Sequence, residues 1–392
     1  MTDPVYIHGM GLTSAMGEGL DAHRACLWQI GAPNLSVTDD YSPGRALPVG
    51  RVDDGWLPDL AHLPAHEQSR NNRLLWSAWQ QLAPRWEQAA PDLSRVAVII
   101  GTSTSGIGDN EADFAADSPQ KPLYARQQIA APARFLARQL GVSGPAYTLS
   151  TACTSGAKAI AAGRRLLQAG VVDWVIAGGA DALCGLTVRG FGALDAMSDA
   201  PCNPMSVNRN GINIGEAAAL FLLSRTPSEL AVTGAGESSD AHHISAPDPE
   251  GVGAERALRA ALADAALPAE AVGYINLHGT ATQLNDKMEA HAIARVFPAS
   301  VPCSSTKPFT GHTLGAAGAL EAGICALALQ GEQLPPHYWD GQADAALPPL
   351  NLVSARAASS GWAAGDRHVL STSFAFGGNN IALLLSAVAK AE

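Results

Sequence analysis

Short apolar runs alternate along the chain with longer, alanine-rich stretches. The clearest runs are residues 95–101 (RVAVIIG), 174–178 (WVIAG) and 272–277 (VGYINL), and loops that contain glycine separate them. Apolar runs of this length, bounded by turn residues, are typical of buried strands, and the spacing between them suits crossover helices. The pattern therefore predicts an α/β fold.

Three segments in the first part of the chain resemble three segments in the second part, in the same order. The pairs are 215–224 (GEAAALFLLS) with 377–386 (GGNNIALLLS), 98–103 with 275–280, and 149–170 with 303–323. Such internal similarity indicates repeated structural units. We therefore expect two similar halves, residues 1–230 and 231–392, whose equivalent loops face one shared cleft.

Composition and charge narrow the class of protein. The 392 residues include 25 Lys and Arg against 36 Asp and Glu, a net charge of −11. Proteins that bind nucleic acid normally carry a basic surplus, so no nucleic-acid partner is expected. No segment reaches the roughly 18 uninterrupted apolar residues of a membrane span, and the amino end does not resemble a signal peptide. The six cysteines lack CxxC spacing, which favours a reducing, cytoplasmic location without disulfides or a metal cluster.

Cys153 lies among small polar residues, immediately before a predicted helix that continues to about Gly170. The positive end of the helix dipole and nearby N–H groups lower the pKa of a thiol at such a position and favour the thiolate. A nucleophilic cysteine fits here. A small buried residue at a tight helix start fits the same local sequence.

Two histidines in the second half favour the catalytic interpretation. His278 ends a predicted strand in NLHGTAT, and His312 precedes a predicted helix in GHTLGAAGALEAG. Because loops at strand ends build the sites of α/β proteins, two facing halves would bring both histidines to Cys153. Lys307 adds a cation able to orient a carboxylate, and Glu321 on the following helix is its candidate partner.

These residues belong to motifs spread over nearly the whole chain. In order, the motifs are TACTSG at Cys153, AGGADA at Ala177, HGTATQLND at His278, STKPFTGHTLGAAGALEA at Ser305 and FAFGGNN at Phe374. Together they resemble the β-ketoacyl-acyl carrier protein synthases of the elongating Cys-His-His type. The resemblance implies a thiolase-like fold, with two pseudo-symmetric halves in an αβαβα layered arrangement.

The resemblance also implies an activity and partners. The activity is that of an acyltransferase, a 3-oxoacyl-[acyl-carrier-protein] synthase, which condenses an acyl chain with malonyl-acyl carrier protein as carbon dioxide leaves. The substrates arrive on the phosphopantetheine of acyl carrier protein, so no separate cofactor and no metal are expected. The expected assembly is a homodimer, or a heterodimer with a related subunit. The pathway is fatty-acid synthesis or a specialised polyene or polyketide pathway.

The family's functional residues map onto this chain by motif. Cys153 would take the acyl chain as a thioester, with its own N–H and that of Phe376 as the oxyanion hole. His278 and His312 would donate hydrogen bonds to the malonyl thioester oxygen. The other implied positions are the ion pair Lys307 and Glu321, polar support from Asp286 and Glu289, the pantetheine contacts Thr280 and Thr282, the acyl-pocket residues Ile107, Phe191 and Phe376, and the carrier-docking residues Arg70, Arg73 and Lys121.

The chain departs from the family pattern in two places. Residues 204–219 differ from the usual Phe-Asp, Arg-Asp-Gly-Phe and GEGAG signatures, which affects substrate and partner details. Ala375 replaces the first glycine of the usual GFGG loop. Because alanine restricts the backbone more than glycine does, we expect this loop to swing less when it acts as a gate.

Two other functions fit part of the pattern. A non-catalytic subunit like a chain length factor keeps the fold and the dimer contacts, but it has no physical need for Cys153, His278, His312 and Lys307 together. A biosynthetic thiolase joins two coenzyme A thioesters. Malonyl-dependent condensation distinguishes the predicted synthase from a thiolase.

Overall fold

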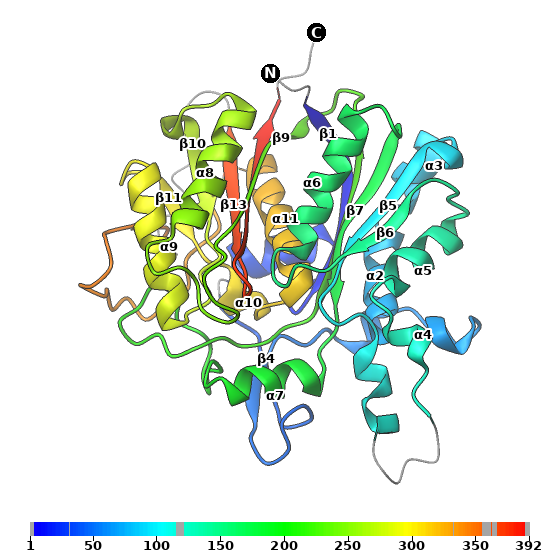
Figure 1. The fold of residues 1–392 in the computed structure, drawn as a ribbon, viewed down its shortest axis with the longest axis horizontal. Helices are drawn as coiled ribbons and strands as arrows, with labels where there is room; N and C mark the ends of the chain where they lie inside the picture. The colour runs from blue at the N-terminus through cyan, green and yellow to red at the C-terminus, as the bar shows by residue number, and fades with distance from the viewer. Residues whose placement is uncertain are drawn as a thin grey trace.

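The protein combines one large sheet with helices packed in layers (Figure 1). The structure is a computed structural model that describes residues 4–30, 32–114, 121–331, 333–354, 362 and 367–388. The three apolar runs expected to be strands lie in β5 (Val96–Gly101), β7 (Trp174–Asp181) and β10 (Val272–Asn276). The predicted α/β fold is confirmed.

The remaining strands and helices extend this sheet and cover its faces. The other strands are β1 (Val5–Ser14), β2 (Gly17–Glu18), β3 (Ser36–Thr38), β4 (Leu47–Val49), β6 (Ala146–Leu149), β8 (Ala217–Ser224), β9 (Leu230–Ser239), β11 (Pro302–Ser304), β12 (Asn351–Leu352), β13 (His368–Phe374) and β14 (Asn379–Ala387). The helices are α1 (Leu20–Arg24), α2 (Arg70–Gln80), α3 (Ala83–Ala89), α4 (Tyr124–Gln127), α5 (Ala131–Leu140), α6 (Ser155–Gln168), α7 (Gly185–Ala193), α8 (Val252–Ala265), α9 (Gln283–Val296), α10 (Lys307–Thr310) and α11 (Ala317–Gln330). Short helical turns are η1 (Ala25–Ile30), η2 (Asp54–Trp56), η3 (Ala65–Glu67), η4 (Leu93–Arg95), η5 (Ile107–Phe114), η6 (Ala269–Ala271) and η7 (Leu314–Ala316).

The strands repeat one arrangement twice. In the first half the order is β1, β8, β7, β5 and β6, and in the second it is β9, β14, β13, β10 and β11. Each set has two antiparallel pairings followed by two parallel pairings. The sets meet where β1 pairs with β9. The similar sequence segments occupy equivalent places, since β8 corresponds to β14 and β5 to β10. The division after residue 230 stays a prediction.

The helices complete a layered αβαβα arrangement. Helices α2 and α5 cover the outer face of the first set of strands, and α8 and α9 cover that of the second. Helices α6 and α11 pack against each other between the two sets (Figure 1). A side chain at Gly156 would place its Cβ 2.9 Å from the Cβ of Ala319, so the close approach of these helices requires a glycine. The start of α6, next to Cys153, is thereby fixed against the second half.

Helix α11 is buried along its whole described length except at its last residue. A helix that is apolar on every side belongs in the interior of a large protein or in a membrane. Here α11 packs in the central layer, against α6 and the strands on both sides. Among the described residues, no helix has both the length and the apolar character needed to cross a bilayer.

Candidate active site

Cys153 lies in the tight turn between β6 and α6, with only 6% of its surface exposed. The preceding residue, Ala152, has a φ of 54°, a left-handed conformation that residues with a Cβ rarely adopt. Ser155 stabilises the turn, because its hydroxyl accepts the N–H of Thr151 at 2.9 Å and donates to the carbonyl of Ala152 at 2.5 Å. The turn fixes Cys153 at the amino end of α6.

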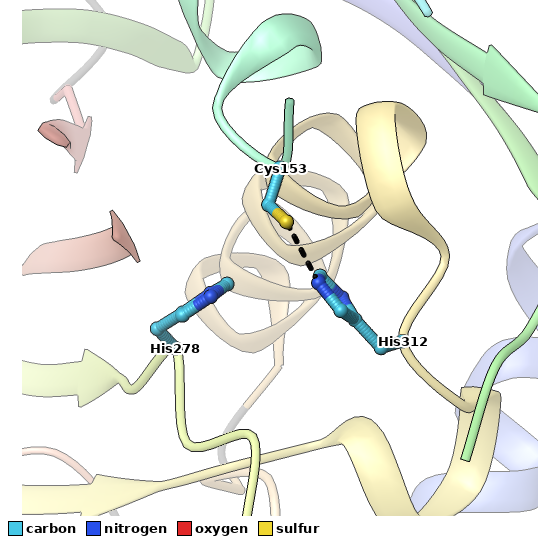
Figure 2. Close-up of side chains that lie close together, drawn as sticks. All are labelled: Cys153, His278 and His312. Atoms are coloured by element: carbon cyan, nitrogen blue, oxygen red, sulfur yellow. Dashed lines mark hydrogen bonds between the residues drawn. The ribbon is translucent and has the colours of Figure 1, made fainter. Parts of the chain in front are cut away.

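His312 contacts the thiol directly. Its Nε2 lies 2.9 Å from the Sγ of Cys153, as the dashed line in Figure 2 marks. The backbone of His312 is held on both sides, since its N–H donates to the carbonyl of Asn213 at 2.6 Å and its carbonyl accepts the N–H of Gly215 at 2.9 Å. The ring is therefore positioned by the segment that leads into β8.

His278 completes the cluster from the end of β10. The ligand atoms of Cys153, His278 and His312 all lie within 4.8 Å of one another. The two imidazole rings meet edge to face, with centroids 5.3 Å apart, and both lie beside the cysteine in Figure 2. The structure thus brings together the three residues that the sequence predicted to converge.

A buried ion pair determines which nitrogen of His278 carries the proton. The Nζ of Lys307 lies 3.3 Å from the Nδ1 of His278 and also pairs with Glu321. Both charged residues are at most 3% exposed. An ammonium group can only donate, so Nδ1 of His278 accepts and the ring proton lies on Nε2. His278 is thereby set as a hydrogen-bond donor through Nε2.

Burial governs the protonation of the cluster. It raises the pKa of the Cys153 thiol to about 12, against an opposite effect of the Lys307 charge. Burial, reinforced by Lys307, lowers the pKa of both His278 and His312 well below the ordinary value. At neutral pH the thiol is protonated and both imidazoles are neutral.

The direction of the Cys153 shift differs from the sequence prediction. The helix start was expected to lower the pKa of the thiol, but the local sequence does not reveal how deeply the residue is buried. A protonated thiol needs a proton acceptor before it can attack a substrate. Nε2 of His312 is at the right distance, and Nδ1 of His312 has no partner among the described residues, so either ring nitrogen can carry the proton.

Glu289 holds the backbone of the loop that carries His278. Its two carboxylate oxygens accept the backbone N–H groups of His278 and Gly279, each at 2.7 Å, and the hydroxyl of Thr372 donates to it at 2.9 Å. Asp286 similarly accepts the N–H of Ala281 at 3.1 Å. These contacts fit the support expected for both carboxylates, which hold the backbone rather than the imidazole.

Glu289 also makes stability depend on pH. Burial raises its pKa from 4.5 to about 7. Because the folded carboxyl binds its proton more tightly than the unfolded one, its stabilising contribution is present below pH 4.5 and is lost as the pH rises through 7. Relative to Glu289→Gln, the free energy of unfolding of the wild type should fall by roughly 3 kcal/mol between pH 4.5 and pH 8. Urea unfolding at several pH values measures this difference, and a pH-independent difference would contradict the assignment.

Two supporting residues were missed by sequence reasoning. Asp181, buried at the end of β7, accepts the N–H of Gly315 and the hydroxyl of Thr102, each at 2.6 Å. It therefore ties the loop after His312 to the end of β5. Its position in the AGGADA motif, at the end of a predicted strand, could have identified Asp181 as a residue that supports the site. Asn213 holds the backbone of His312, and no local pattern indicated that role.

A cavity of about 380 Å³ leads to the cluster and is lined by Cys153, His278 and His312. Of the residues expected to bind substrate, Thr280, Thr282, Phe191 and Phe376 also line it, and the last two rings lie 5.4 Å apart. Ile107, the first residue of η5, is half-buried and does not line this cavity. The acyl-pocket role of Ile107 stays a prediction.

The backbone around Phe376 leaves one donor free. The N–H groups of Ala375 and Gly377, on either side, donate to backbone carbonyls. No hydrogen bond to another described residue uses the N–H of Phe376 or that of Cys153, and the N–H of Cys153 lies close to its own thiol. Both residues line the cavity, so their N–H groups are available for a substrate oxygen.

The expected carrier-docking residues have different surroundings from one another. Arg70 is committed within the molecule, because its guanidinium pairs with the buried Glu216 and with Asp54. Arg73 donates to the carbonyls of Leu57 and Pro58, each at 3.0 Å. Lys121 is exposed. Both arginines also anchor the loop that precedes α2, and the docking role of Arg70, Arg73 and Lys121 stays a prediction.

The cluster also has the spacing of a three-ligand metal site. Its chemistry opposes a divalent cation, because the ammonium of Lys307 lies 3.3 Å from Nδ1 of His278 and adds a buried positive charge beside the cluster. The residues fit acyl chemistry better than metal binding.

Comparison with known proteins identifies the sequence family. Residues 68–228 match the profile of the family described as "Beta-ketoacyl synthase, N-terminal domain", and residues 230–338 match "Beta-ketoacyl synthase, C-terminal domain". The chain is 36% identical over 373 residues to "Nodulation protein E" of Rhizobium meliloti, covering 88% of this chain and 87% of the relative. It is 33% identical over 368 residues to "3-oxoacyl-[acyl-carrier-protein] synthase 2" of Staphylococcus aureus (strain COL), covering 85% and 87%.

Solved structures agree with the fold over its full length. One is that of a ketosynthase (ApeO) in complex with its chain length factor (ApeC) from Xenorhabdus doucetiae. It matches with a TM-score of 0.91 and 42% identity, covering 98% of each chain. The ishigamide ketosynthase/chain length factor matches with a TM-score of 0.86 and 29% identity, covering 99% of this chain and 100% of that chain.

Proposed function

The chain belongs to the β-ketoacyl synthase family, and we propose from this that it condenses an acyl chain carried on Cys153 with malonyl-acyl carrier protein. It is a 3-oxoacyl-[acyl-carrier-protein] synthase, an acyltransferase that releases carbon dioxide and forms a 3-oxoacyl thioester. One observation carries the proposal. In the buried cluster, Nε2 of His312 lies 2.9 Å from the Sγ of Cys153, and Nζ of Lys307 lies 3.3 Å from Nδ1 of the neighbouring His278.

The first half-reaction transfers the acyl chain to the enzyme. The sulfur of Cys153 attacks the thioester carbonyl as its proton passes to Nε2 of His312, which is in hydrogen-bond reach. The free N–H groups of Cys153 and Phe376 stabilise the oxyanion of the tetrahedral intermediate. The bond to the pantetheine sulfur then breaks, and the departing thiolate takes the proton from His312. No net proton is gained or lost.

The second half-reaction forms the carbon–carbon bond. The malonyl thioester oxygen accepts hydrogen bonds from Nε2 of His278 and from His312, which stabilise the enolate as the carboxylate leaves as carbon dioxide. The enolate carbon attacks the acyl carbonyl on Cys153. The carbon–sulfur bond breaks, and the cysteine sulfur takes up one proton from solvent. Neutral imidazoles serve this step, which agrees with the lowered pKa of both rings.

The proposed function also includes a carrier protein that delivers the substrates and a second subunit. Thr280 and Thr282, which line the cavity, are in place to hold the pantetheine arm, and acyl carrier protein is the partner that delivers it. A second subunit, either a copy or a related chain such as a chain length factor, completes the enzyme. We also propose a cytoplasmic location, since all six cysteines are free and buried. Fatty-acid and specialised polyene or polyketide pathways both use this reaction.

A condensation assay tests the function directly. The purified chain, together with any partner subunit it requires, should form 3-oxoacyl-acyl carrier protein and carbon dioxide from acyl- and malonyl-acyl carrier protein. Mass spectrometry of the carrier detects the product. Condensation of two acetyl thioesters without malonyl would instead indicate a thiolase. A chain that never becomes acylated yet activates a related subunit would be a non-catalytic partner.

A further inference from the structure

His337 is a buried histidine that lies outside the catalytic cluster. It is 3% exposed and belongs to the segment between α11 and β12. The N–H of Ser305 donates to its Nδ1 at 3.0 Å, and its Nε2 donates to the carbonyl of Pro204 at 3.0 Å. A backbone N–H can only donate and a carbonyl can only accept, so the ring is neutral with its proton on Nε2. His337 therefore joins two loops that lie far apart in the sequence.

The first of these loops leads to the contact between Lys307 and His278. Ser305 follows the last residue of β11, and its hydroxyl donates to the carbonyl of Gly279 at 2.7 Å and accepts the N–H of Lys307 at 3.4 Å. A Cβ on Gly279 would lie 2.5 Å from that of Ser305, so these two residues are in direct contact. A shift of Ser305 therefore moves both the residue after His278 and the backbone of Lys307.

The second loop reaches the other end of the loop that carries His278. Pro204 is followed by Met205, whose φ is 64° and whose N–H donates to Oδ2 of Asp286 at 2.8 Å. The other oxygen of Asp286 accepts the N–H of Ala281 at 3.1 Å. Ala281 lies three residues after His278, so the bond to Pro204 supports the far end of this loop.

We propose that His337 is a positioning residue for the condensation step. Through Ser305 and Pro204 it holds residues 278–281, the His278 loop, from both ends. The inference rests on the proposed function, because the interaction that it supports is the hydrogen bond from Nε2 of His278 to the malonyl oxygen. His337 is not among the described residues that line the catalytic cavity, so it acts through the loop and not by touching substrate.

The orientation of His278 is sensitive to this support. Its ring has Lys307 as its one hydrogen-bond partner among the described residues, so the direction of Nε2 follows the positions of the His278 loop and of Lys307. Both of these are bonded to the hydroxyl of Ser305. A misplacement of about 1 Å at a reacting group costs up to about 10²-fold in rate.

The acylation step does not use this support. The turn of Cys153 is held by Ser155, and the backbone of His312 is held by the segment that leads into β8. Among the described residues, no hydrogen bond joins His337 to either of these supports. A defect at His337 should therefore slow condensation and spare acylation.

The first test variant is His337→Phe, which keeps a flat ring of similar size and removes both hydrogen bonds. Condensation from preformed acyl-enzyme should fall by about tenfold to 10²-fold, whereas acylation should stay within about twofold of the wild-type rate. Rapid-quench mass spectrometry of the two half-reactions gives both rates. Their ratio is a readout that a general loss of stability does not change.

Two conservative variants, His337→Asn and His337→Gln, separate the two hydrogen bonds. Asparagine places its carbonyl oxygen near the position of Nδ1 and can accept the N–H of Ser305, whereas glutamine places its amide nitrogen near the position of Nε2 and can donate to Pro204. The Ser305 bond leads to both groups that orient the catalytic ring. His337→Asn should therefore recover most of the condensation rate that His337→Phe loses, and His337→Gln should recover little of it.

His23 provides a matched control for burial. It is fully buried, and its ring makes two hydrogen bonds, with the carbonyl of Gly19 at 2.8 Å and with the hydroxyl of Ser14 at 2.9 Å. These bonds connect α1 to β1, and none of the three residues lines the catalytic cavity. His23→Phe should lower the melting temperature, as His337→Phe should, yet leave both half-reaction rates of the folded enzyme unchanged.

Three results would overturn the proposal. Equal slowing of acylation and condensation in His337→Phe, or unchanged rates beside a lowered melting temperature, would make His337 a structural residue like His23. Recovery of condensation by His337→Gln but not by His337→Asn would show that the Ser305 bond is not the route. If His337→Phe does not fold, the half-reaction rates of the Asn and Gln variants against the wild type decide the question. A wild type that condenses no carrier-bound substrate would instead contradict the proposed function, and the positioning role with it.

Discussion

Cys153→Ala should abolish the covalent acyl adduct and reduce condensation by roughly 10⁴-fold or more, the scale seen when a covalent nucleophile is removed. The reason is that Cys153 is the thiol whose Sγ lies 2.9 Å from a histidine nitrogen able to take its proton. After incubation with acyl-acyl carrier protein, intact-mass spectrometry should show one acyl group on the wild type and none on the variant. The amount of 3-oxoacyl product gives the loss in rate.

A second buried cysteine provides the control for this experiment. Cys184 is 1% exposed and contacts the hydroxyl of Thr187 at 3.4 Å, with no histidine among its hydrogen-bond partners in the described residues. Cys184→Ala should therefore keep the acyl adduct and the condensation rate. An adduct that persists on Cys153→Ala, or disappears from Cys184→Ala, would place the nucleophile elsewhere and contradict the mechanism.

The fold was predictable because its signals are local and repeated. Strands such as β5 and β10 are buried on both faces, so they appear in the sequence as continuous apolar runs. The similarity of β8 to β14 follows from their equivalent positions in two sets of strands with the same order. The convergence of His278 and His312 on Cys153 followed from that repetition, since equivalent loops end at the same cleft.

The parts that could not be predicted depend on contacts between distant residues. The ion pair of Arg70 with Glu216 is one example, because Glu216 lies far along the chain and is fully buried. A charged residue's exposure is set by such a partner, which no local pattern reveals. The pKa of Cys153 has the same origin, because the helix start is visible in the sequence and the depth of burial is not.

The two histidines should respond differently to removal. In His278→Ala, condensation from preformed acyl-enzyme should fall by about 10² to 10³, the usual cost of losing an oxyanion donor. Acylation should stay near the wild-type rate, because the ring of His278 has no hydrogen bond to Cys153 in the structure. In His312→Ala, both condensation and acylation should slow, since Nε2 of His312 is also the acceptor for the thiol proton. The sequence alone predicted the same behaviour for both residues.

Separate measurement of the two half-reactions checks this division. Rapid-quench mass spectrometry gives the acylation rate, and adding malonyl-acyl carrier protein to purified acyl-enzyme gives the condensation rate. His62→Ala, a change of an exposed histidine, should leave both rates unchanged. Equal slowing of acylation in His278→Ala and His312→Ala would mean that the thiol proton does not pass specifically to His312. Normal condensation from preformed acyl-enzyme in His278→Ala would mean that His278 does not stabilise the enolate. The contact of Lys307 with Nδ1 of His278 would then have no role in the condensation step.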